Sequence, residues 1–308
     1  MSVSKKAERM YPYLKEKAVE PLTENETKEV YQNIRAMTLH KVGSIAINNT
    51  DNLLLSSIVG LQSVACYSHY FLLIGSIRQV LNQMFQGITA SVGNLGVLEN
   101  SDRIKKVFEV SFYVGFWIFG FSSICLFELL NPFVEFSFGK EYVFTIDIVF
   151  VLCLNFYLTG MRRVTLVFRD SMGLFWHDRY RSIVEAIINL VASVILGMRY
   201  GTLGVFIGTL ISTVTVPLWL EPLILYKYRI GASMKSYFAK YAFYTFIIFF
   251  AGGMTHVACG PHGFIVRVLI CAILPNGLIA LLTHRTEEFR YLKHMLIPII
   301  SRRLKWKQ

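Results

Sequence analysis

Residues 111–130 read SFYVGFWIFGFSSICLFELL, and residues 241–258 read YAFYTFIIFFAGGMTHVA. A helix formed by either stretch carries apolar side chains around its whole circumference, which does not suit the half-buried surface helix of a soluble protein. Each stretch is close to the roughly 20 residues that a helix needs to cross about 30 Å of hydrocarbon. We therefore interpret both as membrane-spanning helices.

Apolar segments of this kind recur along the chain, and the composition agrees with them. Of 308 residues, 54% are hydrophobic and only 17% are charged, whereas about 25% are charged in soluble domains. The sequence predicts an all-α, polytopic membrane bundle between a charged connector (1–37) and a basic amphipathic tail (284–308). The predicted spans are 38–60, 65–97, 111–130, 142–161, 182–198, 200–226, 241–258 and 263–283.

The basic charge of the chain is distributed by topology. The net charge is +11, and 27 of the 31 Lys and Arg residues lie in the segment up to Lys41, in alternate loops or in the tail. Because cytoplasmic loops carry an excess of Lys and Arg, this side is predicted to be cytoplasmic, with both termini on it. The charge therefore predicts no nucleic-acid partner.

Motifs for soluble catalysis are missing from the sequence. It has no G-x-x-x-x-G-K-[ST], H-E-x-x-H, C-x-x-C or G-x-S-x-G pattern, and its five cysteines are scattered. Residues 1–36 hold no apolar core of a cleavable signal peptide. We expect no enzyme, no catalytic residue, no cofactor and no metal site.

Polar residues follow one another through the first two predicted spans at helical spacing. A charge near the bilayer centre costs about 2.5–3.5 kcal/mol on insertion scales, so each needs a reason. One interpretation is a hydrated cavity in which Arg78 faces an anionic substrate; the alternative is a buried Asp51–Arg78 pair, or a ladder of amide side chains, that only joins the helices. The candidate cavity residues are Asn48, Asp51, Asn52, Arg78, Gln79, Asn82, Gln83 and Gln86.

A second set of candidates lies at the cytoplasmic ends of the helices. Arg162, Arg163, Arg169 and Arg179 surround the loop GLFWHDRYRS (173–182) and are predicted to bind lipid phosphates. The tail places Phe289, Leu292 and Met295 on one face, which predicts a helix lying on the inner leaflet. Glu185 and Glu221, near span ends, are interpreted as interfacial or helix-capping acids.

Several strings resemble a known family. They include NNTDNLLLSSIVGLQSVACYS (48–68), GLFWHDRYRSIVEAIINLVAS (173–193) and GVFIGTLISTVTVPLW (204–219). In order and spacing they are similar to bacterial polysaccharide flippases, the Wzx-like branch of the multidrug/oligosaccharidyl-lipid/polysaccharide exporter superfamily. The resemblance is closest over residues 30–230.

The resemblance implies a transporter of the bacterial cell membrane. Such a protein moves undecaprenyl-diphosphate-linked oligosaccharide units between leaflets for capsule or exopolysaccharide synthesis, and Arg78 is the position that matches a diphosphate-binding role. Family members have twelve to fourteen spans in two lobes, so this chain is expected to be the C-terminal six-helix lobe plus two helices, lacking the first six. Expected partners are the bilayer, the polyprenyl-diphosphate-linked glycan, an N-terminal lobe supplied in trans, or a polysaccharide polymerase.

Other functions remain open from the sequence. A cation-coupled multidrug antiporter of the same superfamily would need acids without a balancing cation, whereas Arg78 is expected to balance Asp51. A membrane glycosyltransferase or polymerase would need a large outer loop or an acidic catalytic pair, and the predicted outer loops are short. A half that does not transport but serves as a partner subunit is the remaining alternative.

Overall fold

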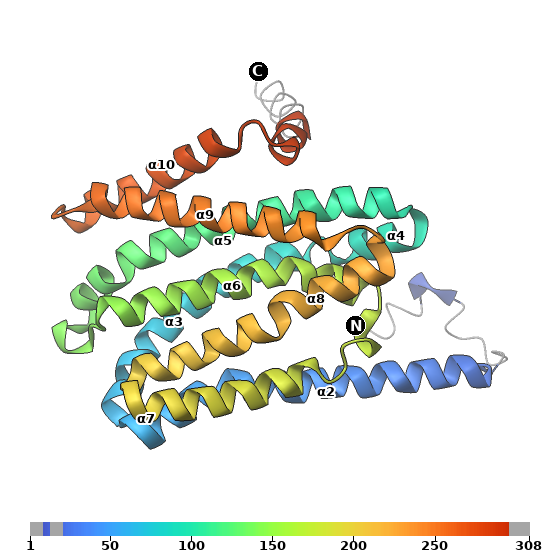
Figure 1. Ribbon diagram of the computed structural model, residues 1–308, viewed down its shortest axis with the longest axis horizontal. Coiled ribbons are helices and arrows are strands. Elements are labelled where there is room, and N and C mark those ends of the chain that lie inside the picture. Colours follow the sequence, from blue (N-terminus) through green and yellow to red (C-terminus); the bar gives the residue numbers. More distant parts are fainter. Residues whose placement is uncertain (1–8, 13–20, 296–308) are drawn as a thin grey trace.

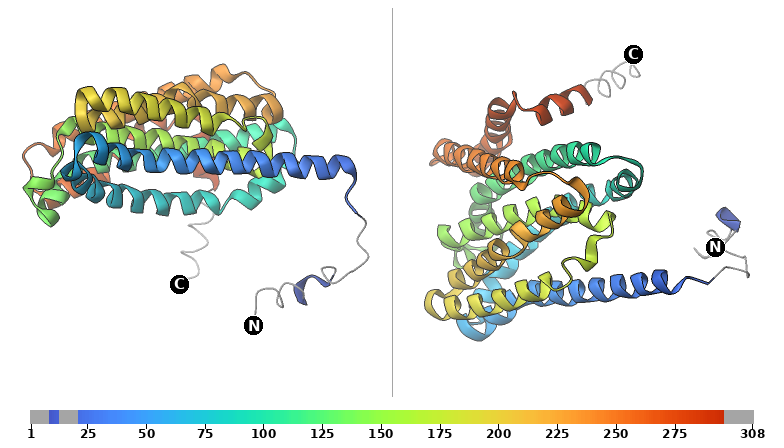
Figure 2. Two further views of the ribbon diagram at one scale, coloured as in Figure 1. Left: turned by 90° about the horizontal axis from the view of Figure 1, so that it is seen from below. Right: turned by 45° about the vertical axis from the view of Figure 1, so that its right-hand side comes forward.

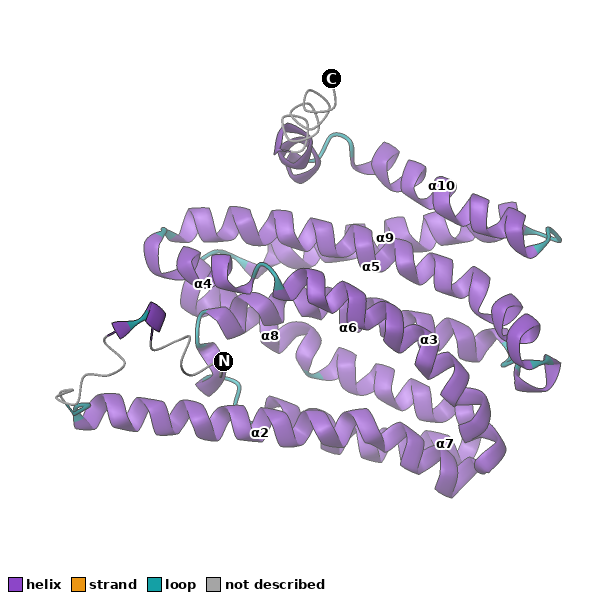
Figure 3. Ribbon diagram, turned by 180° about the vertical axis from the view of Figure 1, so that it is seen from behind, coloured by secondary structure: helices purple, strands orange, loops and turns teal. Residues whose placement is uncertain are grey.

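The structure is a computed structural model that describes residues 9–12 and 21–295. All regular secondary structure in these residues is helical (Figure 1, Figure 3), which confirms the all-α prediction. The main helices are α2 (Glu24–Leu54), α3 (Leu61–Gln86), α4 (Thr89–Leu98), α5 (Ser101–Phe138), α6 (Ile146–Ser171), α7 (Arg181–Thr215), α8 (Pro217–Leu225), α9 (Met234–Cys259) and α10 (Phe264–Thr283).

The long helices run back and forth along one axis. Figures 1 and 2 show the start of α2, the loop 172–180, the start of α9 and the end of α10 at the same end of the bundle. We call this the basic end, because the cation-rich loops meet there. The opposite end holds the turns at Gly60, 139–145 and 260–263.

Helix α7 reverses direction at Gly201 without a loop. The backbone of Gly201 has φ 59° and ψ −137°, a region that suits glycine and strains other residues. Its two arms then pack closely, because a Cβ at Gly208 would lie 2.5 Å from the Cα of Ser193. The arms correspond to the two predicted spans 182–198 and 200–226, and α8 continues the second arm after Pro217.

Aromatic side chains from α5, α6 and α9 fill the centre of the bundle. Phe116 stacks on Tyr244 with ring centroids 4.4 Å apart, and both rings are buried. Phe119 lies over Gly160, where a Cβ would come within 2.2 Å of the ring. This packing holds α6 as a fixed inner wall, with the cavity described below on its other side.

Five helical stretches among the described residues are long and apolar enough to cross a membrane. They are Ser101–Phe138, Ile146–Ser171, Arg181–Ile230, Met234–Cys259 and Phe264–Thr283. The third contains the reversal at Gly201 and therefore covers two predicted spans. The helices α2 and α3 have the expected length but more polar sequences, so composition alone does not mark them as spans.

The structure describes parts of both predicted flanking segments. Helix α2 runs through the predicted boundary at residue 37, since Thr23 and Glu26 form a capping box that starts the helix at Glu24. In the tail, residues 287–295 are helical, and Phe289 stacks on Trp117 while Leu292 packs against the core. The described tail therefore rests on the bundle; residues 296–308 lie outside the described part.

Candidate functional site

A cavity of about 240 Å³ lies between α2, α3, α6 and both arms of α7. Every third or fourth residue of α2 contributes to it, from Ser44 through Ile47 to Asp51, as one face of a helix requires. Three arginines and two carboxylates line it. The charged lining residues are Asp51, Arg78, Arg162, Arg181 and Glu185.

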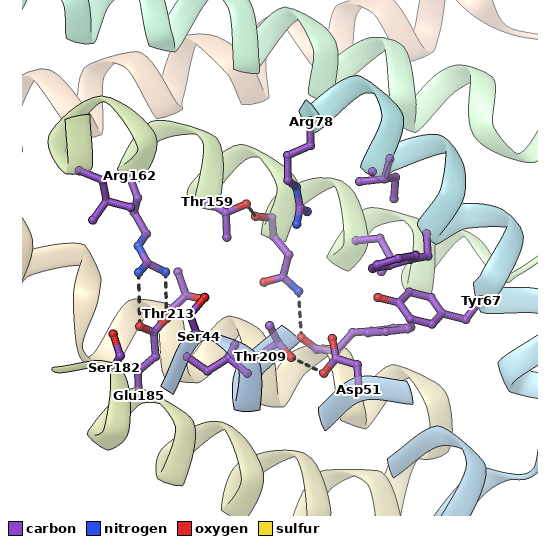
Figure 4. Close-up of a pocket in the computed structure, with 18 of the residues that line it drawn as sticks. Ser44, Asp51, Tyr67, Arg78, Thr159, Arg162, Ser182, Glu185, Thr209 and Thr213 are labelled. Atoms are coloured by element: carbon purple, nitrogen blue, oxygen red, sulfur yellow. Dashed lines mark hydrogen bonds and ion pairs between the residues drawn. The ribbon is translucent and has the colours of Figure 1, made fainter. Parts of the chain in front are cut away.

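Figure 4 shows how these groups are ordered along the cavity. Arg162 and Glu185 lie at one end, Asp51 and Tyr67 lie at the other, and Arg78 lies between them. Ser182 and Arg181 begin α7, so the Arg162 end faces the basic end of the bundle.

Arg78 reaches the cavity from the inner face of α3. That face comprises Tyr67, Phe71, Ile74 and Arg78. The Nε of Arg78 is buried and has no hydrogen-bond partner, and the guanidinium carbon lies 6.0 Å from the centre of the Phe156 ring. Among the described residues, no carboxylate lies within ion-pair distance of it. A guanidinium held in this way is available to an anion that enters the cavity.

Asp51 is held by a chain of hydrogen bonds from the two arms of α7. The hydroxyl of Thr209 donates to Oδ1 of Asp51 at 2.9 Å, and Nδ2 of Asn189 donates to that hydroxyl at 3.0 Å. The Oδ1 of Asn189 is buried without a partner. Asp51 and Arg78 thus share one cavity but form no direct ion pair in the described part of the chain.

A buried ion network lies at the end of the cavity nearest the basic end. Arg162 on α6 binds Glu185 at 2.9 Å and Glu221 on α8 at 2.8 Å. Arg181 binds the same two carboxylates at 3.0 and 2.8 Å. The side chains of all four are at most 12% exposed. Glu185 and Glu221 are therefore buried network members, and their interpretation as interfacial or capping acids is wrong.

The network continues to the loop before α7. Asp178 is bound by Arg169 and by Nε of Arg181. Its Oδ1 lies 3.1 Å from Nε2 of His40 on α2, whose Nδ1 is 3.0 Å from Oγ of Ser182. Burial alone would raise the pKa of Asp178, but the hydrogen bond from His40 and the two guanidinium charges lower it to about 2.

The structure separates the predicted cavity residues into two groups. Asp51 and Arg78 line the cavity. Asn52 and Asn82 are half-buried, whereas Gln79, Gln83 and Gln86 are exposed on another face of α3. The side chain of Asn48 lies outside the described part.

The predicted lipid-phosphate arginines are also divided. Arg162 and Arg169 are buried and bound to carboxylates, which corrects their assignment to a lipid-facing surface. Burial of a guanidinium requires such partners. Arg163 and Arg179 have no salt bridge within the described residues, so for them the assignment stays a prediction.

Sequence reasoning missed the polar residues that α6 and α7 contribute. Asn155, Asn189, Thr209 and Thr213 lie on or beside the cavity. A signal was available: Asn189, Ser193, Thr209 and Thr213 recur at intervals of four within two predicted spans, the same pattern that identified Asp51 and Arg78.

The comparisons with known proteins bear on the fold. No protein-family model matches the sequence, and no curated protein matches it. Among solved structures, the chain is similar to lipid II flippase MurJ in its inward closed conformation, with a TM-score of 0.57 and 13% identity. The match covers 81% of this chain and 52% of that one, so the chain spans about half the length of that flippase. The chain is a multi-pass membrane protein with the fold of about half of a lipid II flippase.

Proposed function

We propose that this chain forms one lobe of a flippase for polyprenyl-diphosphate-linked oligosaccharides. Arg78 carries the proposal: it is a cavity-lining guanidinium with no carboxylate in ion-pair contact among the described residues, and its buried Nε has no hydrogen-bond partner. A diphosphate is the anionic group of such a lipid carrier, and an arginine fork suits its oxygens. The fold shared with about half of lipid II flippase MurJ supports the proposal.

The proposed mechanism is alternating access of two lobes around this cavity. The head group crosses through the polar cavity while the lipid tail stays in the bilayer. We propose that a second lobe, supplied by further sequence or by another chain, covers the exposed glutamines of α3, because exposed polar groups at membrane depth need a polar or hydrated partner. The finer assignment, capsule or exopolysaccharide synthesis in a bacterial cell membrane, rests on the resemblance of the sequence to Wzx-like flippases.

The decisive experiment replaces Arg78 and measures flipping. In cells whose polysaccharide export depends on this protein, Arg78→Gln should reduce export at least tenfold, because one charge-assisted contact to the diphosphate is lost. Gln79→Ala is the matched control, because Gln79 is adjacent but exposed away from the cavity. Membrane levels and thermal unfolding of both variants should match the original protein. Unchanged export by a folded Arg78→Gln variant would reject the proposal.

Asp51 is the proposed binding group for a coupling proton or sodium ion. The chain contains no ATP-binding loop of the P-loop type, and Asp51 has hydroxyl and amide neighbours but no arginine in ion-pair contact. Asp51→Asn should remove the dependence of flipping on an ion gradient in proteoliposomes, while binding of the lipid-linked glycan is kept. If the variant still responds to the gradient, Asp51 does not couple.

A cation-coupled multidrug antiporter is the second candidate. The absence of an Asp51–Arg78 ion pair among the described residues favours it more than the sequence did, since Asp51 has no directly bound cation. Arg78 opposes it, because its guanidinium lines the same cavity and repels a cationic drug. If the original protein transports a cationic drug and the Arg78→Gln variant transports it equally well, the antiporter is favoured over the flippase.

A further inference from the structure

Arg179 and Lys227 lie at the basic end, outside the buried ion network. Arg162, Arg169 and Arg181 are neutralised by carboxylates. Arg179 and Lys227 form no salt bridge within the part of the chain that the structure describes. Lys227 is exposed and Arg179 is half-buried, so their charges face the surroundings of the bundle.

Aromatic rings hold both cations in place. The guanidinium of Arg179 lies 4.1 Å from the Trp176 ring centre and 4.8 Å from that of Tyr180. The ammonium of Lys227 lies 5.4 Å from the Tyr228 ring centre. The rings of His177 and Tyr228 are only 3.8 Å apart, so the loop before α7 and the segment after α8 form one surface. We call Trp176, Arg179, Tyr180, Lys227 and Tyr228 the aromatic–cation surface.

An apolar stripe leads away from this surface along α7. Its residues recur every three or four positions and are 44–72% exposed, although they are large and apolar. They form one outward face of the first α7 arm, from the basic end to the opposite end. The stripe consists of Tyr180, Val184, Ile187, Val191, Ile195 and Met198.

We propose that the aromatic–cation surface binds the phosphate of an anionic phospholipid, whose acyl chain lies along the α7 stripe. The charges of Arg179 and Lys227 are complementary to the head group, and their aromatic supports are of the residue types that concentrate at the membrane–water interface. The adjoining stripe supplies the apolar contact that an acyl chain needs. This surface is separate from the cavity and does not depend on the proposed flippase activity.

A soluble polyanion fits the same surface less well. An acidic peptide or a nucleic acid would satisfy Arg179 and Lys227 but would leave the continuous stripe from Val184 to Met198 in water. Because the chain is a membrane protein, we expect that stripe to face acyl chains. The lipid therefore accounts for both the charges and the apolar face with one occupant.

The test uses Trp176 as a reporter in vesicles that mix zwitterionic and brominated anionic phospholipids. Trp117, Trp219 and Trp306 are replaced by Phe, so that quenching reports lipid beside Trp176. Quenching should be stronger than the mole fraction of brominated lipid alone would give. We expect a preference for anionic lipid of about fivefold per cation, because each surface cation contributes about 1 kcal/mol to lipid binding. Arg179→Gln and Lys227→Gln should each lower the preference toward one, and added salt should weaken it.

Arg199→Gln is the matched control. Arg199 is an exposed arginine at the far end of the same α7 arm, so its loss should leave Trp176 quenching unchanged. If the variant without the other tryptophans does not fold, native mass spectrometry measures the same preference. It compares the phospholipids retained by the original chain with those retained by its Lys227→Gln variant. The proposal would be overturned if quenching simply followed the mole fraction of brominated anionic lipid. It would also be overturned if the preference for anionic lipid survived both substitutions. Binding of a soluble polyanion to the surface would not rescue it in either case.

Discussion

At the scale of single residues, Asp178 is the group on which the buried arginines most depend. Its side chain is fully buried and bound by Arg169, Arg181 and His40. Asp178→Asn should lower the free energy of unfolding by about 3–5 kcal/mol, because buried guanidinium groups lose their counter-charge. Thermal unfolding in detergent near neutral pH measures the loss. Asp170→Asn is the control, since Asp170 also binds Arg169 but is 39% exposed, and it should cost less than about 1 kcal/mol.

The same residue predicts the direction of a pH effect. The pKa of Asp178 is lowered to about 2 in the folded protein, from an ordinary value of 3.8. A lowered carboxyl pKa stabilises the fold above about pH 4, and this contribution is lost as the pH falls toward 2. The original protein should therefore lose more unfolding free energy over this interval than Asp178→Asn does. Parallel losses for both proteins would show that Asp178 is not ionised within the network.

At the scale of helices, the apolar pattern predicted the spanning helices but not the residue at which each helix begins. Segments such as 111–130 and 241–258 lie within α5 and α9 as expected, because their apolar residues leave no other environment for them. The reversal at Gly201 was expected as a turn between two spans. The start of α2 at Glu24 is set by the capping box of Thr23 and Glu26, because this polar, charged stretch carries little apolar periodicity.

The site was only partly predictable for a related physical reason. Spacing along one helix placed Asp51 and Arg78 correctly on inner faces, since three- and four-residue intervals define a helix face. It could not distinguish the inner face of α3 from the face of Gln79, Gln83 and Gln86, because polar residues occupy both. Nor could it pair Arg162 with Glu221, which are far apart in sequence and meet only when α6 packs against α8.

At the scale of the whole molecule, charge and helix direction point to one topology. The start of α2 and the end of α10 lie at the basic end (Figure 1), where the cation-rich loops also lie, so the positive-inside rule predicts that this end faces the cytoplasm. The two ends also differ within the cavity, because the ion network lies only on the side near the basic end. In this orientation Asp51 lies farther from the cytoplasm than the ion network does.

Cysteine labelling tests this topology, and α2 is its critical element, since its composition does not mark it as a span. In a background without the five native cysteines, Leu61→Cys, Lys140→Cys and Arg199→Cys at the opposite end should react with a membrane-impermeant maleimide in intact cells. Leu61 is 78% exposed and begins α3 after the turn at Gly60, so it reports whether α2 crosses. Arg103→Cys and Lys235→Cys at the basic end should react only after permeabilisation. If only Leu61→Cys fails to react in intact cells, α2 does not cross the membrane. If the basic-end cysteines react in intact cells and the opposite-end cysteines do not, the bundle spans the membrane but the charge rule gives the wrong orientation.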